Sequence, residues 1–148
     1  MKKLVIKIQI YQISWTPNIV WAVSLLKAFE YIEQIWWYEV LEEVEKELIE
    51  YALEKFLKIK GLKLIWSKEI SSRLWVFSFI IDWIHSLDIA DYLAEHNVCI
   101  RAWQHCAEPF LTSLWISHSC RMSLYIYNTK EDIDKFFDIL KRAILELK

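Results

Sequence analysis

The sequence predicts an α+β fold in which a small, mostly antiparallel sheet is covered by helices. The first observation is that apolar residues recur at helical spacing in two long segments before Gly61. The second is that short strand-like segments follow Gly61, interleaved with only two further helical patterns. The chain has 148 residues, which is enough for one domain with a buried core or for a part of a larger protein.

The N-terminal part of the chain is expected to form one strand and two helices. Residues 4–13 alternate between apolar and polar side chains, as in a short strand. Thr16 and Pro17 then begin a helix as its N-cap and first helical residue, and a pair of tryptophans ends it. The second helix spans about residues 39–60, and Gly61 ends it as a C-cap glycine.

We expect the sheet to be built after Gly61. The segment 74–81 is almost continuously apolar, which predicts a central strand. The segment 120–127 alternates cleanly, so Cys120 and Arg121 should face opposite sides of the sheet. The predicted strands are residues 62–65, 74–81, 98–102 and 120–127.

Two further helices should cover this sheet. Ser86 is expected to cap one that continues through residue 93. The run from Thr129 to Asp132 is a capping box for the last helix. Residues 103–118, before the last strand, are expected to be irregular. The apolar stripe of the last helix consists of Ile133, Phe136, Phe137, Leu140, Ile144 and Leu147.

The balance of glycine and tryptophan is abnormal. The chain has one glycine and nine tryptophans, whereas average glycine usage of about 7% predicts about ten glycines. Several tryptophans stand between predicted elements, where glycine usually supplies a positive φ without steric cost. We weigh two hypotheses: UGA codons that mean glycine in the organism have been translated as tryptophan, or the protein has a tryptophan-rich core.

The charge balance argues against partners that are held by a strong electrostatic field. The formal net charge at pH 7 is -2 and the pI is about 6.1, so neither nucleic acid nor an anionic membrane is an expected partner. No segment has the roughly 18 consecutive apolar residues of a membrane helix. Lys7 interrupts the only candidate for a secretory signal. Together with three cysteines that cannot all pair, these features predict a cytoplasmic protein.

A cluster of potentially reactive side chains lies between residues 101 and 109. Cys106 directly follows His105 and is five residues from Arg101. Neighbouring cations favour the thiolate, which is the nucleophilic form of cysteine. The cluster therefore predicts a functional thiol at Cys106, with a loop cysteine of no consequence as the alternative.

Two other uses of these side chains stay open. Arg121 could bind a carboxylate with its forked guanidinium, or it could pair with an acidic residue at the surface. A zinc site is the competing use of the thiols, although no CxxC or HxxxH pair places two ligands on one turn. The residues considered for zinc are Cys99, His105, Cys106, His118 and Cys120.

Four segments carry motifs that occur together in one enzyme family. Residues 101–109 are similar to Arg-x-Gly-His-His-Cys-Ala-x-Pro, and residues 120–123 to Cys-Arg-Ala-Ser. Residues 127–134 are similar to Tyr-Asn-Thr-x-Glu-(Asp/Glu)-(Ile/Val)-Asp, and residues 15–18 to Gly-Thr-Pro-Asn. From about residue 13 to its end, the chain thus resembles the C-terminal part of SUF-type (group II) cysteine desulfurases, which have the class V aminotransferase fold.

The resemblance implies a fold and an activity. The fold would be that of the C-terminal domain of fold-type I transferases that depend on pyridoxal 5'-phosphate. The enzyme would take sulfur from L-cysteine, release alanine and supply a sulfur-acceptor protein for iron-sulfur cluster assembly. It would act as a homodimer. All nine tryptophans fall on or beside positions where such sequences tend to carry glycine, which favours the recoding hypothesis.

The resemblance also implies roles for single residues. Cys106 would attack the substrate sulfur and hold it as a persulfide, with His105 as the proton-transfer candidate beside it. Arg121 would bind the substrate carboxylate, and Arg101 would line the same cleft. Thr16, together with the backbone of Trp15, would approach the phosphate of the cofactor across the subunit boundary.

The chain departs from the family in two ways. Gln104 replaces a family histidine, and Trp103 stands at a family glycine. Nothing in the chain resembles the Ser-x-His-Lys motif whose lysine binds the cofactor, so we expect that this lysine lies in a larger domain that is missing here.

The expected organisation follows from that missing domain. Residues 1–15 would be a remainder of it, residues 16–60 two linking helices, and residues 61–148 the small domain with the active cysteine. We expect the chain alone to be inactive as a desulfurase. The alternatives are a cofactor-free persulfide carrier or assembly module that uses Cys106, and an inactive remnant.

Overall fold

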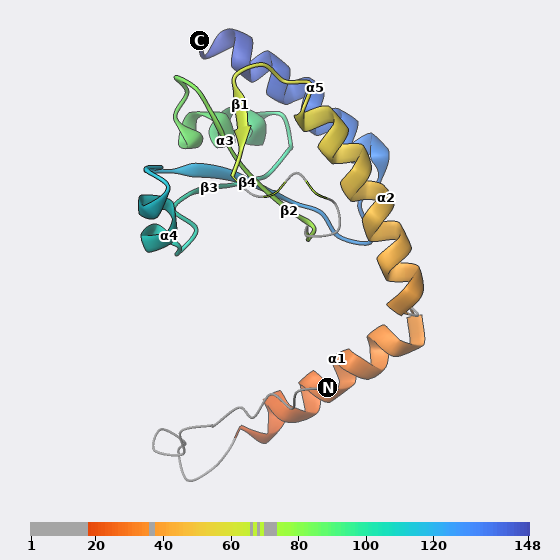
Figure 1. The fold of residues 1–148 in the computed structure, drawn as a ribbon. Helices are drawn as coiled ribbons and strands as arrows, with labels where there is room; N and C mark the ends of the chain where they lie inside the picture. The colour runs from red at the N-terminus through yellow and green to blue at the C-terminus, as the bar shows by residue number, and fades with distance from the viewer. Residues whose placement is uncertain (1–17, 36–37, 66, 68, 70–73) are drawn as a thin grey trace. The chain divides into compact units, whose positions relative to one another are not determined.

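The computed structural model describes residues 18–35, 38–65, 67, 69 and 74–148 (Figure 1). They form two compact units, Met1–Tyr38 and Glu39–Lys148, each of which is considered by itself. The predicted strand at residues 4–13 lies outside the described residues. The elements are α1 (Ile19–Ile35), α2 (Tyr38–Phe56), β1 (Leu62–Leu64), β2 (Val76–Ile81), α3 (Ser86–Glu95), β3 (Arg101–Trp103), α4 (Glu108–Ser113), β4 (Ser119–Ser123) and α5 (Lys130–Glu146).

The first unit contains the helix α1. Asn18 caps it, because its Oδ1 accepts a hydrogen bond of 3.1 Å from the backbone N–H of Trp21. The predicted cap, Thr16, lies outside the described residues. The apolar side chains of this helix are largely exposed, including Ile19, Val20, Val23, Leu25, Leu26 and Phe29.

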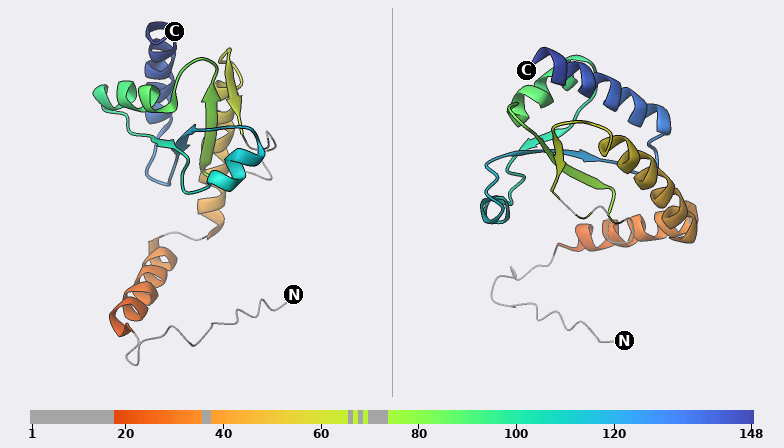
Figure 2. Two further views of the ribbon diagram at one scale, coloured as in Figure 1. Left: turned by 90° about the vertical axis from the view of Figure 1, so that its left-hand side faces the viewer. Right: turned by 45° about the horizontal axis from the view of Figure 1, so that its top comes forward.

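The second unit is built on a four-stranded sheet with the order β1-β2-β4-β3. All three neighbouring pairs are antiparallel. The predicted α+β class with a small antiparallel sheet is therefore confirmed. The prediction that the apolar segment 74–81 is central also holds, since β2 lies between β1 and β4. Figure 2 shows α2 and α5 side by side over the sheet.

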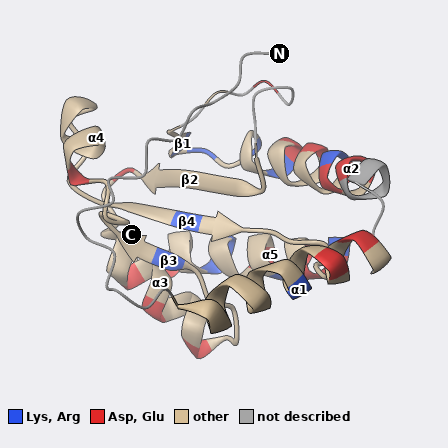
Figure 3. Ribbon diagram, turned by 90° about the horizontal axis from the view of Figure 1, so that it is seen from below, with Lys and Arg blue, Asp and Glu red and all other residues tan. Residues whose placement is uncertain are grey.

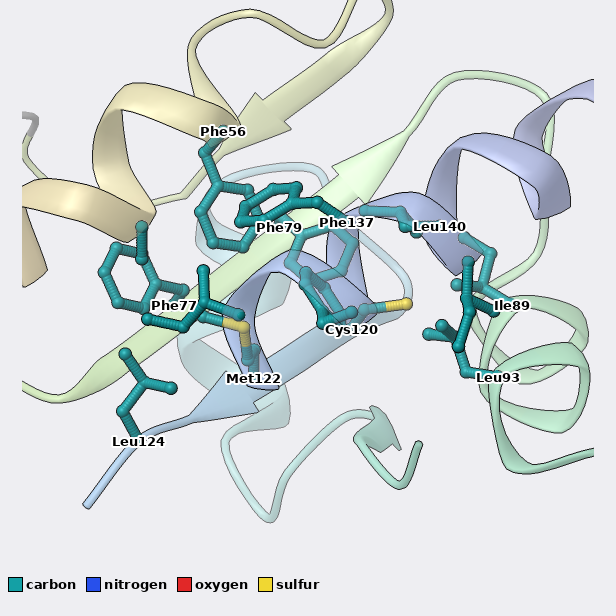
Figure 4. Packing of buried hydrophobic residues seen from close by; sticks show 14 of the residues in the cluster. Phe56, Phe77, Phe79, Ile89, Leu93, Cys120, Met122, Leu124, Phe137 and Leu140 are labelled. Atoms are coloured by element: carbon teal, nitrogen blue, oxygen red, sulfur yellow. The ribbon is translucent and has the colours of Figure 1, made fainter. Parts of the chain in front are cut away.

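Alternation along the strands puts the core on one side of the sheet. Phe77 and Phe79 of β2 are opposite Met122 and Cys120 of β4, and all four side chains are buried. Phe56 of α2 packs against this layer, with its ring centroid 5.0 Å from that of Phe77. Figure 4 shows these side chains together with those of α3 and α5. The helices thus cover the Cys120 side of the sheet, and Arg121 lies on the opposite side.

The helix α5 has the predicted capping box. The Thr129 Oγ1 accepts a hydrogen bond from the Asp132 backbone N–H, and the Thr129 N–H donates to the Asp132 side chain. Asp134 accepts a 2.7 Å hydrogen bond from Tyr51 and lies 2.6 Å from the Lys55 ammonium group. The hydrogen bond with Lys55 lowers the pKa of Asp134 most, and the hydrogen bond with Tyr51 lowers it further. These contacts join α5 to α2 at the edge of the core.

Several predicted boundaries were wrong, among them those of two strands: β3 spans Arg101–Trp103 and not residues 98–102, and β4 ends at Ser123 and not at residue 127. The second helix ends at Phe56 and not near residue 60, because a turn follows in which the Ile59 N–H donates to the Phe56 carbonyl. Gly61, at φ 81°, is the turn residue directly before β1 and does not cap the helix. The cap of α3 is His85 and not Ser86, since the His85 Nδ1 accepts from the Leu87 N–H at 3.2 Å. Ser86 is instead buried in the first turn.

The segment 103–118 is more ordered than predicted. It contains α4, a helix of six residues with Pro109 in its first turn. It also includes Trp103, which ends β3 and pairs with Ser119. A helix this short has too few residues to show a helical period, so the pattern along the sequence did not reveal it.

No helix in the described part of the chain is both long and apolar enough to cross a membrane.

Replacing Phe137 by alanine should lower the free energy of unfolding by about 3–5 kcal/mol, because it empties a fully packed aromatic site. The Phe137 side chain is 1% exposed and meets Phe56 edge-on at 4.8 Å between ring centroids. Urea unfolding of the 148-residue chain measures the loss. Leu145→Ala is the control, since Leu145 is 79% exposed and its truncation should cost less than about 0.5 kcal/mol. Equal losses for the two variants would contradict this packing.

Candidate functional site

The candidate thiol lies at the tip of a tight turn between β3 and α4. The Ala107 N–H donates a 2.9 Å hydrogen bond to the Gln104 carbonyl, which closes the turn. The two central residues, His105 and Cys106, have φ values of 57° and 59°. Positive φ at both central positions is the pattern of a type I′ turn, which glycine, asparagine and aspartate normally occupy. Backbone strain of this kind concentrates at functional sites, and the turn leaves Cys106 exposed.

Two arginines lie beside this turn, on the side of the sheet opposite the Phe77 and Phe79 core. Arg101 of β3 and Arg121 of β4 are direct partners across the antiparallel pair, so their side chains leave the same face. Figure 3 shows these basic positions in blue on the two neighbouring strands. An Arg101 Nη is 4.0 Å from the Cys106 Sγ. The predicted proximity of Cys106 to a guanidinium group is thus observed for Arg101.

Arg121 has an unused hydrogen-bond donor. Its Nε is buried and has no hydrogen-bond partner among the described residues. A buried donor without a partner is costly, and an ionised one is more so. A carboxylate accepts two parallel hydrogen bonds from such a guanidinium group. An anionic ligand could supply the acceptor that this donor lacks, and the binding of a carboxylate by Arg121 stays a prediction.

His105 is anchored to the sheet. Its Nε2 lies 3.0 Å from the Oγ of Ser119, which is fully buried at the start of β4. Burial lowers the pKa of His105, and the positive charges of Arg121 and Arg101 lower it further. The imidazole is therefore neutral near pH 7. A neutral imidazole next to Cys106 can accept a proton, and the bond to Ser119 fixes the side chain that precedes the thiol.

A pair of histidines that no sequence motif brought together lies nearby. The rings of His85 and His118 are 3.9 Å apart between centroids. His118 Nδ1 accepts a hydrogen bond from the Ser86 N–H at 3.4 Å. Burial lowers the pKa of His118, and the charge of His85 lowers it further. The indole of Trp103 lies 5.7 Å from the His85 ring. The two histidines are far apart in sequence, so no local motif could have revealed the pair.

The other two cysteines differ from Cys106. Cys120 is completely buried, and this burial raises the pKa of its thiol to about 12. Its Sγ lies within the apolar cluster drawn in Figure 4. Cys99 is exposed. Among the described residues, no three or more histidine, cysteine, aspartate or glutamate side chains are grouped as a metal site would require. Thr16 and Trp15, predicted to approach a phosphate, lie outside the described residues.

The chain is similar to proteins of one known family. Residues 11–136 match the family model described as aminotransferase class V. A probable cysteine desulfurase of Staphylococcus epidermidis is 39% identical over 128 residues, and one of Staphylococcus aureus is 37% identical over the same length. In both cases the match covers 86% of this chain and 30% of the relative. The chain thus spans about a third of the length of these relatives.

Solved structures give the same result. The cysteine desulfurase CsdA of Escherichia coli, in an S-sulfonic acid form, superposes with a TM-score of 0.75 at 27% identity. This match covers 88% of the chain and 31% of the other protein. The apo cysteine desulfurase of Thermococcus onnurineus has a TM-score of 0.78 at 26% identity, with coverages of 88% and 32%. The sheet with its helices is therefore shared with cysteine desulfurases of distant organisms.

The three thiols should react differently with iodoacetamide. In the native chain we expect rapid labelling of the exposed Cys106 and Cys99, and negligible labelling of Cys120, which is buried and whose pKa is raised to about 12. Peptide mass spectrometry at pH 8 follows each site, and labelling in denaturant is the control in which all three should react. Native labelling of Cys120 as fast as that of Cys99 would contradict the buried position.

The free energy of unfolding should fall as the pH drops below the ordinary histidine pKa of 6.5. His105 and His118 have lowered pKa values in the folded chain, so the unfolded chain binds protons more readily at these two positions. Their contribution is complete above 6.5 and is lost as the pH falls through the folded pKa values. Urea unfolding at several pH values from 7.5 to 5 measures how steeply the free energy of unfolding falls with pH. His105→Gln should make this fall less steep. An unchanged slope in this variant would be the contrary result.

Proposed function

Because the chain belongs to the class V aminotransferase family, we propose that it is the sulfur-accepting part of a cysteine desulfurase that depends on pyridoxal 5'-phosphate. The single observation that supports this most directly is the position of Cys106. Its thiol stands exposed on a strained turn, with a guanidinium group 4.0 Å away and a neutral imidazole in the preceding residue. This is the environment of a nucleophilic cysteine.

The chain would supply only some of the domains of the complete enzyme. Residues 61–148 would form the small domain with the active cysteine, residues 16–60 two helices that link it to a larger domain, and residues 1–15 a remainder of that larger domain. The cofactor-binding lysine would lie in a segment outside this sequence, so the chain alone would be inactive as a desulfurase. The motifs favour the SUF-type (group II) branch, a homodimer, and a protein acceptor that uses the sulfur for iron-sulfur clusters.

The proposed chemical step is a transfer of sulfur to Cys106. The thiolate of Cys106 attacks the sulfur of the substrate L-cysteine, and a sulfur–sulfur bond forms while the carbon–sulfur bond of the substrate breaks. The electron pair of the broken bond stays with the substrate carbon, which takes up a proton and leaves in alanine. Pyridoxal phosphate, when bound, would draw electron density from the substrate and so make this bond cleavable.

Arg121 and Arg101 would bind and orient the substrate. The buried Nε of Arg121 has no partner in the described chain, and the substrate carboxylate would supply the missing acceptor. Arg101 is beside it on the paired strand and reaches toward Cys106, so it would favour the thiolate. The two charges would thus hold the amino acid where its sulfur meets the thiol. Thr16 and Trp15 are proposed to approach the cofactor phosphate.

His105 would act as the general base that accepts the proton of the Cys106 thiol. Its neutral imidazole can accept that proton before the attack, and the bond to Ser119 holds the ring on the sheet while the thiol moves. Gln104 occupies the place of a family histidine and cannot take a proton in the same way. The proton transfer is therefore assigned to His105 alone.

Cys106→Ser should abolish persulfide formation in the complete enzyme, because a serine oxygen cannot hold the transferred sulfur in this form. Cofactor absorbance should be unchanged, since Cys106 accepts sulfur and does not anchor the cofactor. The measurement is persulfide labelling followed by peptide mass spectrometry after addition of L-cysteine. Cys99→Ser is the matched control, being a second exposed thiol, and it should keep full activity.

Two results would contradict the assignment. The first is a persulfide at another thiol of Cys106→Ser at an undiminished rate. The second is a desulfurase activity of the 148-residue chain without any added domain. If the chain alone instead accepts sulfur on Cys106 from another protein without bound cofactor, the carrier function replaces the desulfurase.

A further inference from the structure

The backbone at several tryptophans has a conformation that suits glycine. Trp15, Trp36, Trp37 and Trp66 lie outside the described residues, which leaves five of the nine tryptophans to consider. Three of these five have φ in the left-handed region, with values of 73° at position 83, 94° at position 103 and 59° at position 115. The chain's one glycine, at φ 81°, is in the same region. Residues with a Cβ atom are rare in this region, and a bulky side chain there is an outlier.

Position 115 shows what the backbone requires. Trp115 directly follows the C-cap of α4, and its N–H donates to the Thr112 carbonyl while the Ile116 N–H donates to the Leu111 carbonyl, both at 3.0 Å. This is a Schellman motif, in which the residue at position 115 must be left-handed and is usually glycine. The helix α3 ends in the same pair of bonds, with Asn97 at φ 59° in the equivalent place. Asparagine tolerates this conformation, whereas tryptophan does not share that tolerance.

Position 83 has the same requirement in a different setting. Trp83 lies in the short turn between β2 and α3, where the Ile84 N–H donates to the Ile81 carbonyl. The Trp83 side chain is 93% exposed, and that of Trp115 is 96% exposed. An indole in water recovers none of the free energy that burial would supply. The strain at these two positions is therefore not compensated by packing.

Position 103, next to the candidate site, also has a left-handed backbone at a tryptophan. Trp103 ends β3 at φ 94° and precedes the turn that carries Cys106 by one residue. Its side chain is 48% exposed, and its nearest ring neighbour is His85 at 5.7 Å. A third uncompensated left-handed tryptophan, here at the entrance to the thiol turn, has no physical explanation in the chain as written.

We propose that positions 83, 103 and 115 hold glycine in the protein that the source organism makes, because UGA codons at these positions are read there as glycine. One cause then explains both the strained backbone and the composition, in which nine tryptophans accompany one glycine. A codon has one meaning at all positions of a gene, so the other six tryptophans would follow wherever their codon is also UGA. The turn that carries Cys106 would then begin at a flexible, unobstructed residue.

The direct test is peptide mass spectrometry of the protein isolated from its source cells, together with the codons of its gene. Peptides that contain positions 83, 103 and 115 should have the mass expected for glycine, and all three codons should be UGA. UGG codons, or peptides with the mass expected for tryptophan at these positions, would overturn the proposal.

A second test uses the 148-residue chain and thermal unfolding. Trp83→Gly, Trp103→Gly and Trp115→Gly should each raise the unfolding midpoint by about 3 °C or more, because glycine relieves the left-handed strain. Leu114→Gly is the matched control. Leu114 neighbours Trp115 but has φ -98°, so glycine there should lower the midpoint. Lower midpoints for all three tryptophan variants would show that the indoles belong to the native fold and would overturn the proposal.

Discussion

The register of β4 is the constraint on which the rest of the structure depends. Because side chains alternate along a strand, Cys120 enters the core and Arg121 leaves on the opposite side. Pairing with β2 and β3 fixes this choice on both flanks. A slip by one residue would bury a guanidinium group among phenylalanine rings and expose the apolar layer. The same register that closes the core therefore sets two arginines side by side on the other face of the sheet.

The thiol turn is held by the sheet in spite of an unfavourable backbone. Its two central residues, His105 and Cys106, are both left-handed, and conformations of this kind persist only where the surroundings impose them. Here the bond from His105 to the buried Ser119 ties one side of the turn to β4. The helix α4 begins directly on the other side. The result is an exposed thiol on a turn that is anchored on both sides.

The errors of the sequence-based prediction have local causes. Ser86 has the residue type of an N-cap, yet the chain enters α3 one residue earlier, and His85 caps the helix with its ring nitrogen. Ring nitrogens are seldom counted as caps, so residue type alone favoured the serine. The helix α4 has only six residues and no full apolar period. In contrast, the capping box at Thr129 was predictable because both of its hydrogen bonds form within four consecutive residues.

The sequence by itself determined the fold class, the core stripe of α5 from Ile133 to Ile144, the alternation of Cys120 with Arg121, and the choice of Cys106 as the candidate thiol. These depend on periods and motifs that neighbouring residues carry. Leu147, which was predicted to belong to the stripe, is instead 36% exposed and follows the helix as its C-cap. Only the tertiary structure decided that Arg101 and Arg121 are partners, that Ser119 holds His105, and that His85 meets His118. Each of these contacts joins residues that are distant in sequence, and strand pairing and helix packing, which no local pattern encodes, bring them together.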